Sequence, residues 1–525
     1  MIILHHGKIR TLNVLQPLVE ALAIQGERIL AVGRNEDIIN IAAPDAWVID
    51  LHGQTILPGF TDSHIHLLQY GLKLSQIDCE TISRAECLTR VAKKVQATAP
   101  GTWITGQGWN HNIWQEGIGH KHDLDHISNL HPIFLAAKSL HASWCNSAAL
   151  QLAGIDRHTP DPPGGTIVKD ENREPTGILL ESASNLVEAC IPPLKTSQKR
   201  EVLLDAQQQL LRYGITSVHD VDNWEIYALL QELQPTFFIR VTKSFHRSDL
   251  KEIFRAGLNS GSGNDRLNIG WLKLFMDGAL GPQTAAMLLP YEGTTSHYGM
   301  LTLSAEELFE IGMEAAHYDI RLEIHAIGDK AIHITLDKIE QLASLKNTSP
   351  LPHRMEHVQI IHPPDIQRMA HLQMVASMQP IHVISDMDTA DRYWGKRCAF
   401  SYAWHSIDET GIPLIFGSDA PVETPNPFPA IQAALTRQKS STSQPWFPQQ
   451  RLSLSRTLAA YISRPPAIIG KQHSLGQLQP GFLADLVVLP DDVLQIDPFK
   501  IAQVSPSATM ISGEFRWMDD HFLMP

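Results

Sequence analysis

The sequence is poor in cysteine and has no long hydrophobic run. Its five cysteines are odd in number and include no CxxC pair. A disulfide framework is therefore not expected, and the thiols should be reduced. No uninterrupted apolar stretch is long enough to span a bilayer, and the first residues lack a basic segment followed by a long apolar one. We expect a cytoplasmic protein without membrane contact.

Positive charge is also in deficit. The chain has 42 Lys and Arg against 56 Asp and Glu, a formal net charge of -14. A surface of that sign repels nucleic acid and anionic lipid, so neither is an expected partner. Apolar residues make up 43% and charged residues 19%, which is typical of a globular protein and argues against disorder. The composition thus argues against nucleic-acid and membrane partners and leaves a small-molecule substrate open.

The length and the pattern along the chain indicate more than one structural unit. A chain of 525 residues is too long for one ordinary compact core. Both ends read as short strands and turns, and we predict that residues 1–57 and 470–525 pair into a composite β-sandwich domain. The middle alternates strand-like runs with amphipathic stretches, which is typical of βα units. We predict an α/β fold in which residues 58–469 form a (β/α)8 TIM-like barrel.

Eight strands are expected in the barrel: Ile56–Phe60, Ser217–Val221, Phe237–Val241, Trp271–Phe275, Arg321–His325, Arg354–His357, Met374–Met378 and Leu414–Gly417. The interval 68–211 is too long for one connection between neighbouring strands. It contains Pro/Gly-rich turns and a further strand candidate, Ile133–Ala137. We interpret it as a subdomain inserted after the first barrel strand.

Two histidines stand where the first barrel strand is expected to end. Residues i and i+2 of an extended chain point to the same side, so His64 and His66 can present two imidazoles to one ion. An HxH pair is common by chance. Its position matters more, because the catalytic groups of such barrels lie at the carboxyl ends of the strands.

Lys273 lies within an otherwise apolar strand, where a lysine charge is costly unless it is paired or removed. One interpretation is a salt bridge with a nearby carboxylate such as Asp277. The other is a neutral Lys273 that has reacted with CO2, so that the carbamate oxygens bridge two metal ions. The residues alone leave both open.

Three further polar residues close later strands, namely His325, His357 and Asp419. Any one of them could be a structural residue. Their recurrence at one rim, together with His64, His66 and Lys273, makes chance convergence the weaker hypothesis. We expect a metal site built from these six side chains.

The motifs GFTDSHIH, KLFMDG, EIHAIGD, HRMEHVQ and GSDAPVE follow one another in this order. Together with the C-terminal segment from Ser463, they resemble the amidohydrolase superfamily, specifically its YtcJ-like, amidohydrolase family 3 branch. The resemblance covers essentially the whole chain. It implies the barrel with a composite β-sandwich, a metal-dependent hydrolase activity, and metal ligation by His64, His66, carboxylated Lys273, His325, His357 and Asp419.

Two departures restrict the subclass. Mononuclear nucleobase deaminases pair their third histidine ligand with a nearby glutamate and use no strand-four lysine, whereas this chain has Asp329 and Lys273. D-aminoacylases use a cysteine ligand, and no cysteine here occupies a matching position. Two Zn²⁺ ions are the expected cofactors, with Mn or Fe as alternatives. Asp62, Glu356 and Asp329 are candidates for orienting the ligating imidazoles, and Asp329 fits a helix start equally well.

The expected reaction is hydrolysis of a non-peptide C–N bond, with linear amides or N-substituted formamides as the substrate class. Asp419 is the predicted catalytic base and acid for a metal-activated hydroxide. Substrate contacts are expected from Trp109, His141, Trp144, His219, Asp220 and Arg354, although the tryptophans could equally be subdomain core. Alternatives are a cyclic-amide or ester hydrolase and a degenerate barrel that acts as a scaffold. A homodimer is the commonest assembly for such a chain.

Overall fold

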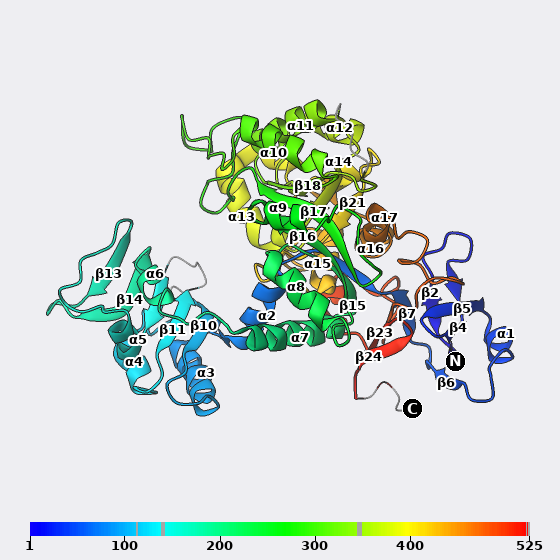
Figure 1. The fold of residues 1–525 in the computed structure, drawn as a ribbon, viewed down its shortest axis with the longest axis horizontal. Helices are drawn as coiled ribbons and strands as arrows, with labels where there is room; N and C mark the ends of the chain where they lie inside the picture. Colours follow the sequence, from blue (N-terminus) through cyan, green and yellow to red (C-terminus); the bar gives the residue numbers. More distant parts are fainter. Residues whose placement is uncertain (112–113, 138–141, 344–348, 521, 523–525) are drawn as a thin grey trace. The chain divides into compact units, whose positions relative to one another are not determined.

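The computed structural model describes residues 1–111, 114–137, 142–343, 349–520 and 522. The chain divides into two compact units. One comprises Met1–Gln69 and Ala206–Pro525, and the other comprises Tyr70–Asp205. The first contains both chain ends and the main sheet (Figure 1). Helices α2 (Leu67–Ser75) and α7 (Thr196–Arg212) contain the points at which the chain passes from one unit to the other.

An eight-stranded parallel sheet forms the centre of the first unit, in the order β21-β20-β19-β18-β17-β16-β15-β8. Its strands are β8 (Phe60–Ile65), β15 (Ile215–Asp220), β16 (Arg240–His246), β17 (Leu267–Phe275), β18 (Arg321–Ala326), β19 (Arg354–His357), β20 (Val375–Met378) and β21 (Leu414–Phe416). A parallel bridge between Ile65 and Ala420 joins the first strand to the segment after the last. The sheet therefore curls into the predicted barrel, and the fold class is confirmed.

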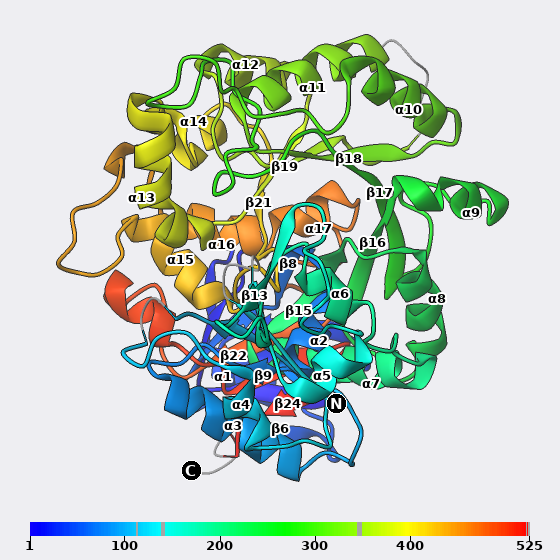
Figure 2. The same ribbon diagram turned by 90° about the vertical axis from the view of Figure 1, so that its left-hand side faces the viewer.

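Helices follow the strands and lie outside them, as Figure 2 shows for α8 to α12. The barrel helices are α8 (Trp224–Leu233), α9 (Leu250–Arg255), α10 (Ala305–His317), α11 (Asp329–Leu342), α12 (Pro363–His371), α13 (His382–Trp394), α14 (Trp404–Asp408), α15 (Pro427–Thr436), α16 (Leu454–Tyr461) and α17 (Arg464–Ile468). Short 3₁₀ turns lie at Arg247–Asp249, Gly395–Phe400, Pro448–Gln450 and Pro498–Gln503.

Two strand positions differ from the prediction. The first barrel strand is Phe60–Ile65, not Ile56–Phe60, and the third is Arg240–His246, not Phe237–Val241. Ile56 belongs to β7 (Thr55–Pro58), which pairs with a C-terminal strand of another sheet. Two strands follow each other here with only Gly59 between them, so the sequence reads as one run. As a consequence His64 lies within β8 rather than after it.

Two further sheets pack around one apolar core in the same unit. The six-stranded sheet, in the order β24-β23-β22-β7-β2-β3, combines strands from both ends of the chain, and the four-stranded sheet has the order β5-β4-β1-β6. The remaining elements are β1 (Ile2–His5), β2 (Lys8–Arg10), β3 (Leu18–Val19), β4 (Ala21–Gln25), β5 (Arg28–Gly33), α1 (Asn35–Ile39), β6 (Trp47–Asp50), β22 (Leu486–Leu489), β23 (Ala508–Ile511) and β24 (Glu514–Met518).

The second unit has a sheet of its own in the order β13-β14-β12-β11-β10-β9. Its elements are β9 (Ile77–Asp78), α3 (Arg84–Gln96), β10 (Ile104–Trp109), α4 (Lys121–Asp125), β11 (Ile133–Ala137), β12 (Ala142–Cys145), α5 (Ser147–Leu152), β13 (Gly165–Lys169), β14 (Pro175–Glu181) and α6 (Ser184–Glu188). Helix α3 begins at a Ser83 cap, whose hydroxyl accepts the Glu86 amide. The expected strand Ile133–Ala137 is present as β11.

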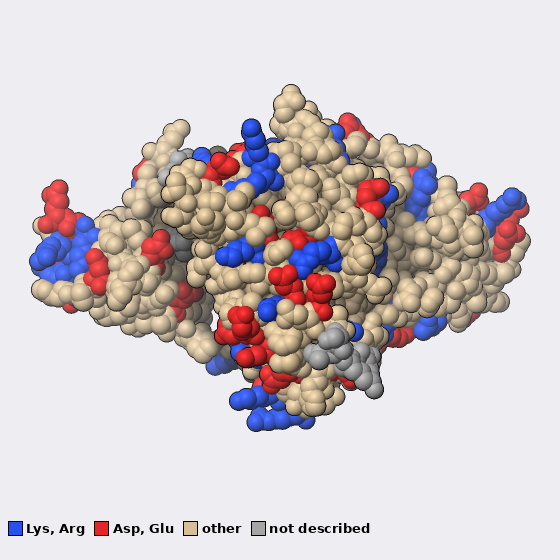
Figure 3. All heavy atoms as spheres, turned by 90° about the horizontal axis from the view of Figure 1, so that it is seen from above, with Lys and Arg blue, Asp and Glu red and all other residues tan. Residues whose placement is uncertain are grey.

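On the face of the molecule drawn in Figure 3, Lys and Arg side chains alternate with Asp and Glu and do not form one basic stripe. None of the helices in the described ranges is both long and apolar enough to cross a bilayer. The cytoplasmic compartment stays a prediction.

Candidate metal centre

Closure of the barrel brings the first and last strands together at their carboxyl ends. The Asp419 amide donates to the His64 carbonyl at 2.7 Å, and the His66 amide donates to the Ala420 carbonyl at 2.9 Å. Asp419 has a positive φ of 60°, which is uncommon outside glycine and asparagine and is held here by the backbone bonds on either side. Asp419, which follows His64 by more than 350 positions in the sequence, is thus held beside the HxH pair.

The side chains of His64, His66 and Asp419 converge. Asp419 Oδ1 is 3.4 Å from His64 Nε2 and 3.5 Å from His66 Nε2. One ligand atom from each lies within 4.8 Å of the others. Two imidazole nitrogens and a carboxylate oxygen suit a divalent transition ion, so the donor set fits the expected metal.

The charge states of these three groups depend on one another. Burial, followed by the nearby Lys273, holds the pKa of His64 well below its usual value, so His64 is neutral as a ligand must be. Burial opposes charge on His66, but the hydrogen bonds that it donates to Asp222 and Asp419 raise its pKa to about 9. Burial also opposes charge on Asp419, yet its hydrogen bond with His66 holds its pKa well below the usual range.

His325 and His357 lie beside this group, with ring centroids 4.5 Å apart. The His357 ring is 5.2 Å from that of His64, and its Nδ1 meets Gln379 Oε1 at 2.9 Å, which leaves Nε2 for the site. His325 Nε2 lies 3.0 Å from the Gly278 carbonyl. Burial lowers the pKa of both imidazoles, to about 4 for His325. His325 lines the same cavity, although it belongs to no close three-ligand group among the described residues.

Lys273 is 2% exposed and lies among these groups. Its Nζ is 3.5 Å from His64 Nε2 and 3.5 Å from Glu323 Oε1. The expected partner Asp277 is instead occupied elsewhere, because its carboxylate accepts the backbone amides of Ala286, Ile327 and Gly328. If Lys273 is salt-bridged, the carboxylate is therefore Glu323 and not Asp277.

A buried ionic network lies around the histidines, and sequence reasoning found only part of it. Glu356 accepts from His64 Nδ1, as expected for a residue that orients a ligand. Glu323 was missed, although it is fully buried between Lys273 and the hydroxyl of Ser244. Glu323 could have been predicted from the sequence, because it stands two positions before His325 and so lies on the same side of the strand.

Arg354 belongs to this network and does not bind substrate in the way expected. It is fully buried, and its guanidinium donates to Glu356, the Ser63 carbonyl and Ser377, with His219 Nδ1 at 3.0 Å. Its donors are therefore committed inside the barrel, which corrects the expectation that it holds an anionic group of the substrate.

His219 and Asp220 also lie inside the barrel. His219 is 1% exposed, contacts Arg354 and packs against the Trp271 ring. Asp220 is fully buried and pairs with Lys243 Nζ at 2.9 Å. Neither lines the cavity beside the histidines, so the structure gives them a supporting role instead of the expected substrate contact. Asp222, which was not among the residues expected from the sequence, lies closer to the site, with its Oδ1 3.8 Å from His66 Nδ1.

Asp62 and Asp329 act through backbone groups and not through imidazoles. Asp62 Oδ1 accepts the amides of His64 and Ser418, and Oδ2 accepts the Ser418 hydroxyl. Burial raises the pKa of Asp62 to about 7. Asp329 is the first residue of α11 and accepts the Leu288 amide at 2.7 Å. Asp329 thus stands at the helix start, as the second interpretation expected, but its cited hydrogen bond is to the backbone of another segment, and the cap position is Gly328.

His382 is the second residue of the site that sequence reasoning missed. It is 6% exposed, begins α13, and offers a ligand atom within 4.8 Å of those of His357 and Asp419. Within the described part of the chain its Nε2 has no hydrogen-bond partner. A buried imidazole nitrogen without a partner is costly, and this one borders the cavity. His382 could have been predicted from the sequence, because it follows the strand end Met378 by four residues and so lies near the rim of the barrel.

A cavity of about 330 Å³ opens above these residues. Its wall combines the histidines, Lys273 and Asp419 with apolar, amide and acidic side chains, among them Phe275, Leu280, Ile327, Gln359, Asp386, Val422 and Glu423. This volume is at the lower end of the range for small-molecule sites.

The residues expected from the inserted segment have a different place. Trp109 and Trp144 are 1% and 0% exposed in the core of their own unit, where they pack with Trp114. The Trp109 indole donates to the Leu135 carbonyl at 2.7 Å. The structure thus gives these tryptophans a packing role in place of the expected pocket wall. His141 lies outside the described residues.

Comparisons with known proteins agree with this geometry. The model of the "Amidohydrolase family" matches residues 47–516. The chain is 31% identical to "Putative amidohydrolase YtcJ" of Bacillus subtilis over 97% of this chain and 98% of that protein. It is 27% identical to "N-substituted formamide deformylase" of Arthrobacter pascens over 98% and 97%. An uncharacterized metal-dependent hydrolase from Pyrococcus horikoshii superposes with a TM-score of 0.78 at 27% identity, covering 95% of this chain and 99% of that one.

The family match spans most of the chain, and the two relatives align over nearly its whole length. The barrel has the fold of the solved hydrolase, and the histidines quoted in the motifs meet at the carboxyl end of its strands. This chain belongs to the amidohydrolase family.

Proposed function

We propose that this chain hydrolyses a linear amide of the N-substituted formamide class, at a site that holds two divalent metal ions. The observation that carries the proposal is the convergence of His64, His66 and Asp419 in the cavity of an amidohydrolase barrel. The formamide class rests on the relative from Arthrobacter pascens, which bears that activity in its name and aligns over 98% of this chain.

The ligand assignment follows the two clusters of imidazoles. His64, His66 and Asp419 would hold one ion, and His325 and His357 the other, with carboxylated Lys273 between them. Zn²⁺ is the ion that we propose for such a histidine-rich set, with Mn and Fe as alternatives for metal analysis. When bound, these ions supply Lewis acidity and make water a stronger nucleophile near neutral pH.

Carboxylation of Lys273 is supported by its surroundings. Its ammonium faces neutral imidazoles whose pKa values it helps to lower. A positive charge at that point would also oppose any metal bound by His64 or His325. A carbamate on the same nitrogen carries the opposite charge and supplies two oxygens, and it removes the cost of the buried cation.

Asp419 and His382 are the residues to which we assign work on the substrate. Asp419 takes the proton from the attacking water and passes it to the leaving nitrogen. His382 donates from Nε2 to the carbonyl oxygen of the amide, where negative charge develops. Support for the second role is the buried Nε2 at the cavity wall, which has no hydrogen-bond partner among the residues that the structure describes.

The cavity also favours one class of substrate. Asp386 and Glu423 line it, while Arg354 is buried in the barrel and unavailable. A negatively charged substrate would be repelled by the two carboxylates. An uncharged amide with a small apolar N-substituent fits beside Phe275 and Leu280.

The test is turnover of a substrate panel by zinc-loaded protein. The panel contains N-substituted formamides, longer N-acyl amides, cyclic amides and simple esters. Asp419→Asn and Lys273→Met are compared with wild type, and bound metal is counted in each. We expect formamide hydrolysis that Asp419→Asn reduces by orders of magnitude while most metal stays bound, and loss of metal in Lys273→Met. Turnover confined to esters or rings would overturn the substrate class, and an active Asp419→Asn would overturn the proton transfer.

A further inference from the structure

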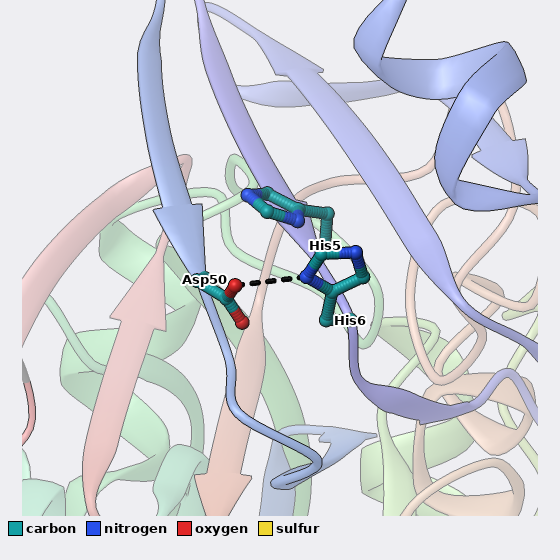
Figure 4. A group of neighbouring side chains, drawn as sticks. All are labelled: His5, His6 and Asp50. Carbon is teal, nitrogen blue, oxygen red and sulfur yellow. Dashed lines mark hydrogen bonds and ion pairs between the residues drawn. The ribbon is translucent and has the colours of Figure 1, made fainter. Parts of the chain in front are cut away.

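A second group of metal-binding side chains lies on the small sheets, away from the residues of the cavity. His5 ends β1 and Asp50 ends β6, and these parallel strands pair with His5 directly opposite Asp50. His6 follows His5 with a φ of 54°. Successive residues of a strand normally point to opposite faces, and this left-handed turn is what places the two imidazoles together (Figure 4).

The three side chains, called here the His5–His6–Asp50 cluster, have the geometry of an incomplete metal site. One ligand atom from each lies within 4.8 Å of the others. The ring centroids of the histidines are 4.4 Å apart, and His6 Nδ1 is 2.8 Å from Asp50 Oδ2. Ligands about 2 Å from a tetrahedral ion are roughly 3.4 Å apart, so modest side-chain rotations close the cluster onto an ion.

A hydrogen bond between His6 and Asp50 does not account for the whole arrangement. His5 Nδ1 is buried and has no hydrogen-bond partner in the described ranges of the chain. Burial and the neighbouring His6 lower the pKa of His5, which favours the neutral imidazole that metal binding requires at this nitrogen. An ion would satisfy it.

The cluster is reachable from solvent and has a fourth donor beside it. The side chains of His6 and Asp50 are 53% and 35% exposed. His52 is 59% exposed, and its Nδ1 is 3.6 Å from Asp50 Oδ1. Its backbone amide already donates to that same oxygen at 2.8 Å, which holds Asp50 in place.

We propose that the His5–His6–Asp50 cluster binds a borderline divalent transition ion of the Zn²⁺ class, with His52 as a further ligand. Two or three imidazoles and one carboxylate favour such an ion over Mg²⁺ or Ca²⁺, which prefer oxygen donors. The ion links the ends of β1 and β6 and shares no ligand with the cavity, so the proposal is independent of the catalytic function.

The test is zinc content of the untagged full-length protein after equilibration in zinc-buffered solution. The variants are His5→Ala/His6→Ala, Asp50→Asn and, as a control, the exposed His473→Ala. We expect wild type and the control to bind one more zinc than the double variant, and Asp50→Asn to bind that extra zinc at least tenfold more weakly. Asp50→Asn keeps the shape of the side chain and so covers the case in which the double variant does not fold.

A second readout identifies the ligands directly. Cu²⁺ added to zinc-loaded protein should show nitrogen superhyperfine coupling by electron paramagnetic resonance, and that signal should disappear in the double variant. Equal zinc content in all four proteins, or a copper spectrum unchanged by the substitutions, would overturn the proposal.

Discussion

Buried polar groups lie at both ends of the barrel, but their hydrogen bonds are arranged differently. At the carboxyl ends of the strands, His64, Asp419 and His382 face a cavity, and one nitrogen among them has no partner in the described residues. At the amino ends, Arg240 donates to both carboxylate oxygens of Asp485, at 2.6 and 2.9 Å. The side chains of that pair are 6% and 4% exposed.

The difference shows how one fold separates stability from chemistry. The pair at the amino end is closed, because the Ser512 amide also donates to Asp485 and the Ser512 hydroxyl accepts from Arg240. This ion pair links β16 to the C-terminal strands of the six-stranded sheet. At the carboxyl end, by contrast, His382 Nε2 borders the cavity without a hydrogen-bond partner among the described residues. Barrels of this class concentrate catalysis at the carboxyl face and stability at the other.

The largest expected effect comes from removing the buried ion pair at the amino end of the barrel. Asp485→Ala leaves the Arg240 charge buried without its partner, which should lower the free energy of unfolding by roughly 3–5 kcal/mol. Urea denaturation measures this, and kcat per folded molecule should stay near that of wild type. The control is Asp388→Ala, which removes the exposed partner of Lys439 and should cost less than about 1 kcal/mol. A fall in kcat with unchanged stability would contradict the division between the two ends.

The next effect tests the open end. His382→Leu replaces the imidazole that borders the cavity by a side chain of similar size without a donor, and should lower kcat by about 10²- to 10³-fold, the usual cost of one donor to a developing oxyanion. Bound metal and the unfolding midpoint should not change. Loss of metal from His382→Leu would instead make His382 a ligand, and unchanged kcat would remove it from the reaction.

The sequence predicted the barrel and the groups at its carboxyl end better than their surroundings. Periodicity and strand-end position were enough to bring His64, His66 and Asp419 to one rim. Strand boundaries failed where Pro58-Gly59 separates two apolar runs that belong to different sheets. Burial was not readable either. Arg354 looks like an anion binder in sequence, but its partners Ser63 and Ser377 lie on other strands, and Ser63 is 291 positions away along the chain.

The smallest effect concerns a histidine at the amino end. His353 Nδ1 accepts the Leu322 amide at 3.1 Å, and its Nε2 lies 3.2 Å from the Arg321 guanidinium. Burial, followed by the charge of Arg321, lowers the pKa of His353 from 6.5 to about 3. The unfolded chain therefore binds a proton that the folded chain refuses. This contribution to stability is complete above pH 6.5 and is lost as the pH falls towards 3, with a slope of up to about 1.4 kcal/mol per pH unit.

Urea denaturation of wild type and His353→Gln at pH 6.5, 5.5 and 4.5 should show a shallower loss in the variant, whereas the exposed His473→Gln should follow wild type. If the free energy of unfolding fell with pH in parallel for all three proteins, His353 would have the same pKa in the folded and unfolded states. Its burial at the amino end would then contribute nothing to the pH dependence of stability.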